Sequence, residues 1–211
     1  MGKEKIKIAA IVKYLNGLFP HARCELNYQK DYELAIAVIL SAQCKDDKVN
    51  KVTPILFNKY PSLMDLADAS FDDVEMILRP LGLSNNKARN IINFSQELVD
   101  KYSSILPSDI NELTSLSGVG EKTAKVIRIE IFKIPDFPVD THIKRIASRL
   151  NLSIKTEPSK ISNDLKSLFK IDDWIRLHHQ LIFFGRYMCK AKHPECKTCK
   201  LQDFCAFFKQ K

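Results

Sequence analysis

The sequence predicts an all-α protein, and three observations support that fold class. Apolar residues recur at the helical spacing of three and four positions along nearly the whole chain. No stretch alternates apolar and polar residues convincingly enough for a strand. Short proline-containing breaks separate the helical segments, at 60–62, 79–82, 106–108 and 134–138. We therefore expect roughly ten helices on short connections, with the break at 135–138 as the candidate domain boundary.

The helical segments follow in chain order. The first has one apolar face near the N-terminus, made by Ile8, Ile11, Val12, Leu15 and Leu18. Residues 34–42 are nearly all apolar, which predicts a buried helix. Residues 86–102 predict an amphipathic helix whose inward residues are Ile91, Ile92, Phe94, Leu98 and Val99. A short polar helix is expected at 109–115, and a further helix at 174–187.

Composition and charge indicate which class of protein this is and what kind of partner it binds. The 211 residues are 45% apolar, which fits a globular protein with one large or two small domains. No apolar run is long enough for a membrane span, and no signal peptide is recognisable, so we expect a cytoplasmic protein. The net charge of +8 favours a polyanionic partner such as nucleic acid. Residues 189–211 carry six lysines against two acidic residues, and so hold half of that excess.

Four of the six cysteines form a C-x6-C-x2-C-x5-C run near the C-terminus. In a cytoplasmic protein this density of thiols indicates a metal site and not disulfides. The irregular spacing suits a 4Fe-4S cluster, although structural zinc is the alternative that spacing alone leaves open. The predicted ligands are Cys189, Cys196, Cys199 and Cys205. Cys24 and Cys44 have no spaced partners and are expected to be small buried residues.

The stretch LSGVGEKTAKVI, residues 116–127, predicts a helix, a glycine turn and a second helix. It is not a P-loop, because one residue separates Gly118 from Gly120 and no strand precedes it. Such a turn presents backbone N–H groups at a helix N-terminus and can hold a nucleic-acid phosphate without reading sequence. Lys122 lies in the first turn of the second helix, where the helix dipole and Lys125 both favour a neutral amine. It is either a nucleophile or a phosphate-contacting, solvated lysine.

Asp140 stands where a new helix begins, in the sequence Val139-Asp140-Thr141-His142. It can be a helix N-cap, a common use of aspartate, but Ile143 occupies the position at which a capping box needs Glu or Gln. A carboxylate here can instead stabilise positive charge that develops on a substrate. The local pattern is compatible with both roles.

Together these blocks resemble the bacterial endonuclease III family of helix-hairpin-helix DNA glycosylases. The matching blocks, in order, are Leu40-Ser41-Ala42-Gln43 with Asp46, residues 116–124, Val139 to His142, and the cysteine run. The resemblance covers essentially the whole chain. It implies a two-lobed fold, with a six-helix barrel domain at 24–134 and an iron–sulfur cluster domain formed by 1–23 and 135–211. It also implies a monomer that acts on duplex DNA containing oxidised pyrimidines or abasic sites, near the bacterial nucleoid.

The resemblance assigns roles to individual positions. Lys122 matches the catalytic lysine, Asp140 the catalytic aspartate, and the four cysteines the ligands of a 4Fe-4S cluster. Gln43 and Leu83 match residues that enter the duplex where the damaged nucleotide leaves, as wedge residues do elsewhere. Gly118 and Gly120 are expected on the DNA backbone, and Ser41 and Asp46 at the lesion pocket. From their loop and charge, Lys190 and Lys192 are also predicted to contact phosphates.

Two departures and two rival functions accompany this resemblance. Ser117 stands where the family commonly has proline, and Cys44 where it often has a small residue. The adenine glycosylase of the same superfamily shares the cluster and the aspartate, but it replaces the lysine. A non-enzymatic iron–sulfur protein that binds DNA or senses redox state would explain the cysteines and the charge. It would need no pair corresponding to Lys122 and Asp140.

Overall fold

The computed structural model describes residues 2–209 and contains no strand in that range, so the prediction of an all-α fold is confirmed. The chain divides into two compact units. Unit 1 comprises Met1–Cys24 and Lys133–Lys211, and unit 2 comprises Glu25–Phe132. None of the helices among residues 2–209 has the length and apolar character of a membrane span.

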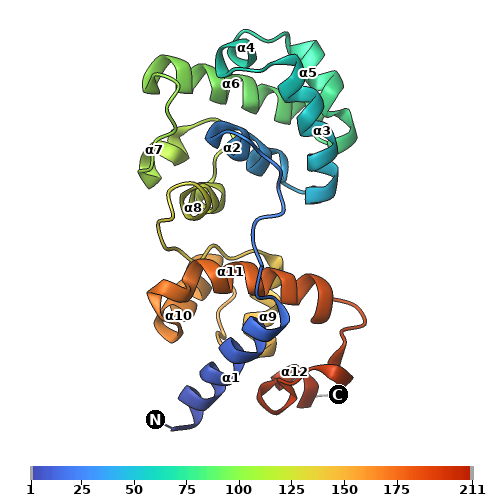
Figure 1. Cartoon of the computed structure of the whole chain (residues 1–211), viewed down its shortest axis with the longest axis vertical. Helices are drawn as coiled ribbons and strands as arrows, with labels where there is room; N and C mark the ends of the chain where they lie inside the picture. The colour runs from blue at the N-terminus through green and yellow to red at the C-terminus, as the bar shows by residue number, and fades with distance from the viewer. Residues whose placement is uncertain (1, 210–211) are drawn as a thin grey trace. The chain divides into compact units, whose positions relative to one another are not determined.

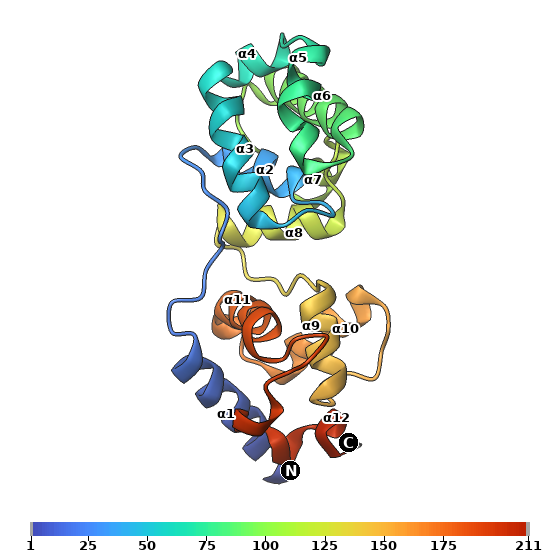
Figure 2. The same cartoon turned by 90° about the vertical axis from the view of Figure 1, so that its right-hand side faces the viewer.

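Unit 2 is built around one buried helix. Helix α2 lies inside the unit, packed against α3, α6 and α8 (Figures 1 and 2). Its apolar residues are almost completely inaccessible to solvent, as the sequence predicts. The elements of unit 2 are α2 (Asp31–Leu40), α3 (Asp46–Lys59), α4 (Leu63–Ala67), α5 (Phe71–Leu78), the 3₁₀ turn η1 (Arg79–Leu81), α6 (Ser84–Tyr102), α7 (Ile110–Ser115) and α8 (Glu121–Glu130).

Helix α2 ends earlier than the apolar run suggests. The predicted helix continued through residue 42, but α2 stops at Leu40. The amide of Ala42 donates to the carbonyl of Ile39, and that of Cys44 to Ser41, so the chain tightens into successive turns. Gln43 then adopts a left-handed backbone with φ 54°. The end of α2 is set by the backbone conformation after Leu40. The side chains stay mostly apolar past that point, so the sequence pattern does not mark it.

Helix α6 is the long amphipathic helix of unit 2. Its inward residues Ile91, Ile92, Phe94 and Leu98 are buried as predicted, whereas Val99 is only half-buried. The helix begins at Ser84, directly after Leu83 in the left-handed region, and is followed by Ser103 in the same conformation. Both ends of α6 are therefore set by sharp reversals of the backbone.

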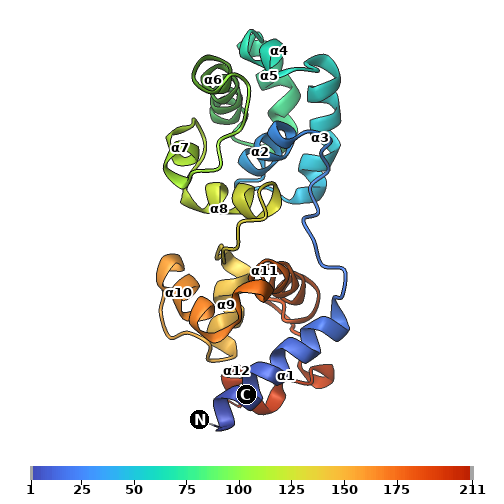
Figure 3. The same cartoon turned by 60° about the vertical axis from the view of Figure 1, so that its left-hand side comes forward.

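Unit 1 joins the N-terminal helix to the C-terminal part of the chain. Helix α9 packs against α10, α11 and α12, and α1 packs against α11 (Figures 1 and 3). Ile11 and Leu15 of α1 are fully buried in a core shared with Phe137, Leu177 and Phe184. The elements are α1 (Gly2–Leu18), α9 (Thr141–Arg149), α10 (Pro158–Leu168), η2 (Ile171–Asp173), α11 (Trp174–Phe183), η3 (Phe184–Met188), η4 (Cys196–Thr198), η5 (Gln202–Phe204) and α12 (Ala206–Lys209).

The segment predicted as one helix at 174–187 is two structures. Helix α11 ends at Phe183 and continues as the wider π turn η3. Gly185 lies inside that turn, and a Cβ there would come within 2.8 Å of the Cβ of His142. The π turn thus packs against α9 so closely that only glycine fits at position 185. It therefore lies beside the Val139-Asp140-Thr141-His142 block.

Candidate functional site

The glycine turn between α7 and α8 forms the predicted helical hairpin. Gly118 has φ +78°, a conformation that other residues adopt with strain. A Cβ at this position would lie 3.0 Å from side-chain atoms of both Ile39 in α2 and Asn90 in α6. Gly120 has ordinary backbone angles and open space around it. Gly118 is therefore required by conformation and packing, whereas Gly120 leaves the surface of the turn unobstructed.

The backbone N–H groups of the hairpin fall into two sets. The amide of Val119 donates to the Leu116 carbonyl at 3.1 Å, and that of Ser117 donates to the Glu97 carboxylate at 2.7 Å. The amides of Gly118 and Gly120 have no acceptor among the described residues. They stand at the N-terminus of α8, where the helix dipole favours an anion. The turn therefore has the donors of a phosphate site.

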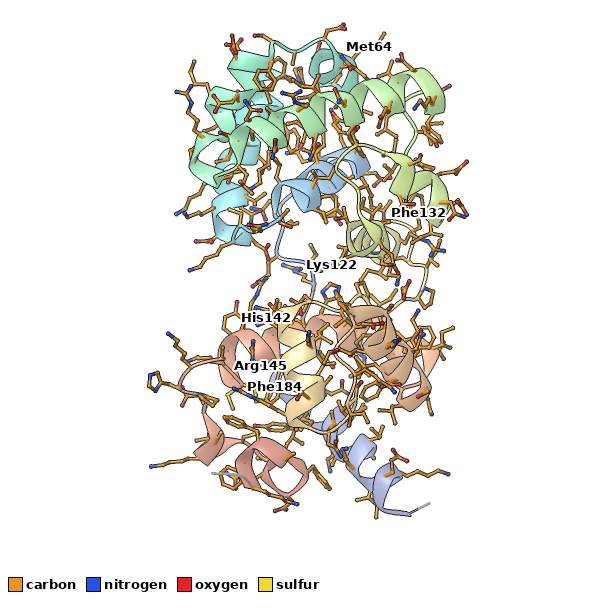
Figure 4. All side chains as sticks on the ribbon, turned by 180° about the vertical axis from the view of Figure 1, so that it is seen from behind. Met64, Lys122, Phe132, His142, Arg145 and Phe184 are labelled. Carbon is orange, nitrogen blue, oxygen red and sulfur yellow. The ribbon has the colours of Figure 1, made fainter. Side chains whose placement is uncertain are left out.

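Lys122 lies in the first turn of α8 with an exposed side chain (Figure 4). Its ammonium makes no hydrogen bond or ion pair within residues 2–209. Lys125, by contrast, pairs with Glu121 at 2.5 Å. Because that charge is already paired, Lys125 acts on Lys122 less than the spacing alone suggests. Lys122 is an exposed amine that follows the glycine turn and is not engaged elsewhere in the described residues.

Asp140 is the N-cap of α9, and its Oδ1 accepts the amide of Ile143 at 2.8 Å. The prediction that Asp140 is a helix N-cap is thus confirmed. Only one carboxylate oxygen is used in this way; among the described residues no hydrogen bond involves the other. The half-buried carboxylate is fixed in direction by the cap and still has an oxygen available. Capping and a catalytic role are compatible at this residue.

His142 and Arg145 lie on the side of α9 that faces the π turn (Figure 4). Arg145 Nη2 donates to the Gly185 carbonyl at 2.8 Å and lies 3.2 Å from His142 Nδ1. Burial lowers the pKa of His142 below its ordinary value. Arg145 and Arg186 act in the same direction, whereas Asp140 and a hydrogen bond with the Gly185 backbone act against it. His142 belongs to the Val-Asp-Thr-His block, but the sequence analysis assigned it no role, and no sequence signal revealed its contact with Arg145.

His178 supports the segment that leads into Asp140. This histidine is almost fully buried, and its Nδ1 lies 3.0 Å from the Pro138 carbonyl. Its ring also packs edge-on against Phe137. Residues 137–138 are therefore held by α11 immediately before the cap. Sequence reasoning did not single out His178, because a histidine within a helix carries no local signal of its partner.

Gln43 and Leu83 share an unusual backbone. Both are exposed residues in the left-handed region, with φ 54° and 52°. Such a conformation costs roughly 1–2 kcal/mol for a residue with a Cβ. Leu83 is 56% exposed although it is a leucine, as its predicted role requires. Strain of this kind persists where the surrounding structure enforces it, and it is frequent at functional sites.

Lys87 is the buried residue beneath the Leu83 turn. Its side chain is only 4% exposed, and its Nζ donates to the Leu81 carbonyl at 3.2 Å. Burial lowers the pKa of Lys87, while the nearby Cys44 acts in the opposite direction. A buried amine that holds the carbonyl two residues before Leu83 helps to enforce the turn. This residue was not predicted, and nothing in its local sequence identifies it.

Ser41 and Asp46 flank Gln43 along the chain, and both are half-buried. The Ser41 hydroxyl donates to the Val38 carbonyl at 2.8 Å, so it is turned back toward α2. Asp46 is the first residue of α3, where a carboxylate is favoured by the helix dipole. Their assignment to a lesion pocket stays a prediction.

The four C-terminal cysteines line one cavity. Cys189, Cys196, Cys199 and Cys205 surround a volume of about 20 Å³, together with mainly apolar side chains such as Leu150 and Phe184. Burial raises the pKa of the Cys199 thiol, and the other three cysteines act in the same direction. Within residues 2–209, no three His, Cys, Asp or Glu side chains are grouped as the ligands of a single metal ion.

Arg149 of α9 holds the loop that begins at Cys189. Its guanidinium donates to the Lys190 carbonyl at 2.8 Å and the Ala191 carbonyl at 3.3 Å, and lies 3.3 Å from the Cys189 sulfur. It also stacks on the ring of Phe207, 4.0 Å from the centroid. The helix capped by Asp140 therefore fixes the cysteine loop directly.

The remaining predicted residues have simpler environments. Lys190 is exposed and pairs with Glu195 at 3.2 Å, while Lys192 is exposed and has no partner in the described part of the chain. Cys24 and Cys44 are half-buried, so the expectation that they are buried was wrong in degree. Each lies in an irregular segment between two helices, where packing is less complete.

The family model that matches this chain, over residues 36–170, is described as the HhH-GPD superfamily of base excision DNA repair proteins. This match covers more than half of the chain and includes the hairpin and Asp140. The fold and the site thus define a base excision DNA repair protein of the HhH-GPD superfamily.

Curated relatives narrow the family. Endonuclease III of Bacillus subtilis is 40% identical over 90% of this chain and 88% of the relative. That of Escherichia coli is 34% identical over 97% of each chain. A solved structure described as a trapped endonuclease III–DNA covalent intermediate is 40% identical and superposes with a TM-score of 0.93, covering 98% of this chain and 97% of that one. The chain belongs to the endonuclease III family, whose members are DNA glycosylases and abasic-site lyases, and it is an enzyme of that class.

Proposed function

We propose that this enzyme removes oxidised pyrimidines from duplex DNA and then cleaves the strand 3′ to the abasic site through a lysine Schiff base. The observation that carries the proposal is Lys122, an exposed amine without a partner in the described residues, held at the end of a glycine hairpin. The similarity to structures described as endonuclease III–DNA complexes supports DNA as the partner. The substrate class comes from the family resemblance, and we expect a monomeric protein of the bacterial cytoplasm.

The chemistry that we assign to Lys122 begins with attack of Nζ on C1′ of the damaged nucleotide. The bond from C1′ to the base breaks, and the base leaves with a proton. The C1′–O4′ bond then breaks and O4′ takes up a proton, so that the amine nitrogen becomes the nitrogen of a Schiff base on the opened sugar. This makes the C2′ proton acidic; its loss expels the 3′ phosphate by β-elimination. A neutral primary amine is the group that this sequence of steps requires.

Asp140 is proposed to stabilise the positive charge that develops on the sugar as the base leaves. Its carboxylate is held in one direction by the bond to the Ile143 amide. A preorganised charge of this kind stabilises the transition state without reorientation during the reaction. Its second oxygen is the group that we assign to the proton transfers around C1′ and C2′.

DNA is proposed to be held and opened by unit 2. The free amides of Gly118 and Gly120 would bind phosphate, and the strained, exposed residues Gln43 and Leu83 would fill the space that the flipped nucleotide leaves. Ser41 and Asp46 would then line the pocket for the extruded base. On unit 1, Lys192 is the better placed of the two loop lysines, because Lys190 already pairs with Glu195.

We propose that the cysteine cavity holds a 4Fe-4S cluster and that unit 1 is the cluster domain, with expected bounds of 1–23 and 135–211. The donor set fits, because four thiols line one mainly apolar cavity, and Glu195, the one carboxylate in its lining, is paired with Lys190. Cys189, Cys196, Cys199 and Cys205 would be the ligands. A bound cluster would cross-link the C-terminal segment, while Arg145 holds the Cys189 carbonyl and Arg149 the Lys190 carbonyl against α9. We expect unit 2 to be the barrel domain, with bounds of 24–134.

Borohydride trapping tests the role of Lys122. Wild-type protein mixed with duplex DNA containing an abasic site should become covalently joined to the DNA through the reduced imine. Lys122→Gln and Lys122→Arg should give no trapped product, since Arg keeps the charge but cannot supply a neutral primary amine. Lys125→Gln, one turn along the same helix, is the matched control and should trap normally.

Two results would contradict this assignment. Trapping that survives in Lys122→Arg would place the nucleophile at another residue. Absence of trapping by an active wild-type enzyme would indicate that water attacks C1′, as in glycosylases without lyase activity.

A further inference from the structure

Glu97 of α6 grips the glycine hairpin by two hydrogen bonds to one residue. The backbone amide of Ser117 donates to Glu97 Oε2 at 2.7 Å, and the Ser117 hydroxyl donates to Oε1 at 3.1 Å. The two residues are 20 positions apart in the chain. Both oxygens of a half-buried carboxylate are therefore committed to a single position in the turn. Hydrogen bonds to an ionised group of this kind are stronger than neutral ones.

The same face of α6 carries a second contact with the hairpin. Asn90 and Glu97 are two helical turns apart, so they lie on one face. Asn90 lies directly beneath Gly118, at the distance where a Cβ would clash. Leu116 and Val119 are buried on either side of these contacts. Each of the four successive residues 116–119 is thus buried, hydrogen-bonded or closely packed, and the free amide of Gly120 and the first turn of α8 follow directly.

Glu97 carries a negative charge next to a turn that is proposed to bind phosphate, so its presence there calls for an explanation. A carboxylate beside a phosphate-binding turn repels the DNA backbone and weakens binding through the Coulomb interaction. A carboxylate that served only as a surface charge would therefore be unfavourable here. Its position is explained if fixing the geometry of the turn gains more affinity than the repulsion loses.

We propose that Glu97 is a positioning residue for DNA binding, which acts through Ser117 to rigidify the hairpin. The inference rests on the proposed role of this hairpin in holding DNA. Proline at position 117 would stiffen the turn through its ring but has no N–H to donate. In this chain a hydrogen-bonded carboxylate on α6 supplies that stiffness from outside the turn.

The test compares three variants by their affinity for duplex DNA with a non-cleavable abasic-site analogue. Glu97→Ala should weaken binding about tenfold, the size expected when hydrogen bonds to a charged group are lost. Glu97→Gln should bind at nearly the wild-type level, because the amide can accept from the Ser117 N–H and donate to its hydroxyl. Asp100→Ala removes a neighbouring exposed carboxylate of α6 and is the charge control; its affinity should be unchanged or slightly higher.

Amide hydrogen exchange measures how firmly Glu97 holds Ser117 in the absence of DNA. The Ser117 amide should exchange slowly in wild-type protein and Glu97→Gln, and much faster in Glu97→Ala. The thermal midpoint should separate this local loosening from general destabilisation. If Glu97→Ala folds poorly, Ser117→Ala provides the second arm: it removes only the hydroxyl bond, and it should weaken binding about threefold, as loss of one bond of modest net strength predicts.

The outcomes are distinguishable. Glu97→Ala binding that equals or exceeds the wild-type affinity, with unchanged exchange at Ser117, would overturn the proposal and leave Glu97 as a surface charge. Gly120→Ala tests the hairpin itself, since its Cβ has space and would stand between the amide and a phosphate. If Gly120→Ala binds DNA normally, the proposed DNA contact of the hairpin fails. If Gly120→Ala binds DNA weakly while Glu97→Ala binds normally, only the proposed positioning role of Glu97 is contradicted.

Discussion

Arg145 presses a guanidinium against the imidazole of His142, two residues after the Asp140 cap. Because a guanidinium can only donate, the 3.2 Å contact between Arg145 Nη2 and His142 Nδ1 favours the neutral ring. Burial lowers the pKa of His142 in the same direction, while Asp140 and a hydrogen bond with the Gly185 backbone oppose it. The net effect is a pKa below the ordinary value for this histidine, which lies between α9 and the π turn.

This arrangement predicts a pH dependence of folding stability. In the interval between the lowered folded pKa and the unfolded value of 6.5, the unfolded state binds more protons than the folded state. The contribution of His142 is complete above 6.5 and is lost as pH falls through the folded pKa. Urea unfolding at about pH 7.5 and about pH 5 should show a smaller loss of stability in His142→Gln than in wild type. Equal losses in the two proteins would show that His142 does not titrate with folding.

At the scale of elements, the turn between η1 and α6 leaves the side chain of Leu83 exposed. Gly82 has φ 69°, Leu83 has φ 52°, and the buried amine of Lys87 holds the Leu81 carbonyl. Leu83 is consequently strained and exposed at once, and it contributes little to the core. A leucine in such a position is explained by contact with a partner more readily than by packing.

We expect Leu83→Ala to slow base release from a lesion in duplex DNA by about tenfold, since unstacking a base pair costs a few kcal/mol that the side chain helps to offset. The thermal midpoint should change little, because the side chain is mostly exposed. Ile105→Ala, at a more exposed apolar residue of unit 2, is the matched control and should leave base release unchanged. A sharp fall in the midpoint with normal base release would mark Leu83 as a core residue.

At the scale of the whole molecule, the segment that carries the four C-terminal cysteines, residues 189–205, lies near the end of unit 1. The last α-helix of the described chain is only four residues long, and the preceding residues form short 3₁₀ turns. Such a segment has little regular secondary structure to stabilise it. The proposed cluster, bound by the four thiols that line one cavity, would fix this segment.

The corresponding prediction concerns iron. Protein purified without added metal from an iron-replete host should be yellow-brown and contain about four irons per chain, as a 4Fe-4S centre requires. Cys199→Ser should lose iron and lower the thermal midpoint, whereas Cys44→Ser in unit 2 should do neither. Stoichiometric zinc without visible absorption would instead establish the zinc alternative.

Much of this protein is encoded in local sequence patterns. The apolar periodicity of α6, the glycine turn at 118–120 and the cap at Asp140 each depend on a few neighbouring residues, because helices and turns are stabilised by near neighbours. The spacing of the four C-terminal cysteines likewise indicates a metal site from the sequence alone. The resemblance of four ordered blocks indicates the family, which the comparisons confirmed.

The tertiary structure alone decided which distant residues support these local features. The Glu97 grip on Ser117 spans 20 residues, and the Arg149 contacts with the Cys189 loop span about twice that separation. The left-handed turns at Gln43 and Leu83 and the π turn at Gly185 also depend on packing against other helices. A periodic pattern fixes which face of a helix is apolar, but not which helix meets that face. The sequence therefore determined the helices and the reactive groups, whereas the packing of one helix on another determined how those groups are held.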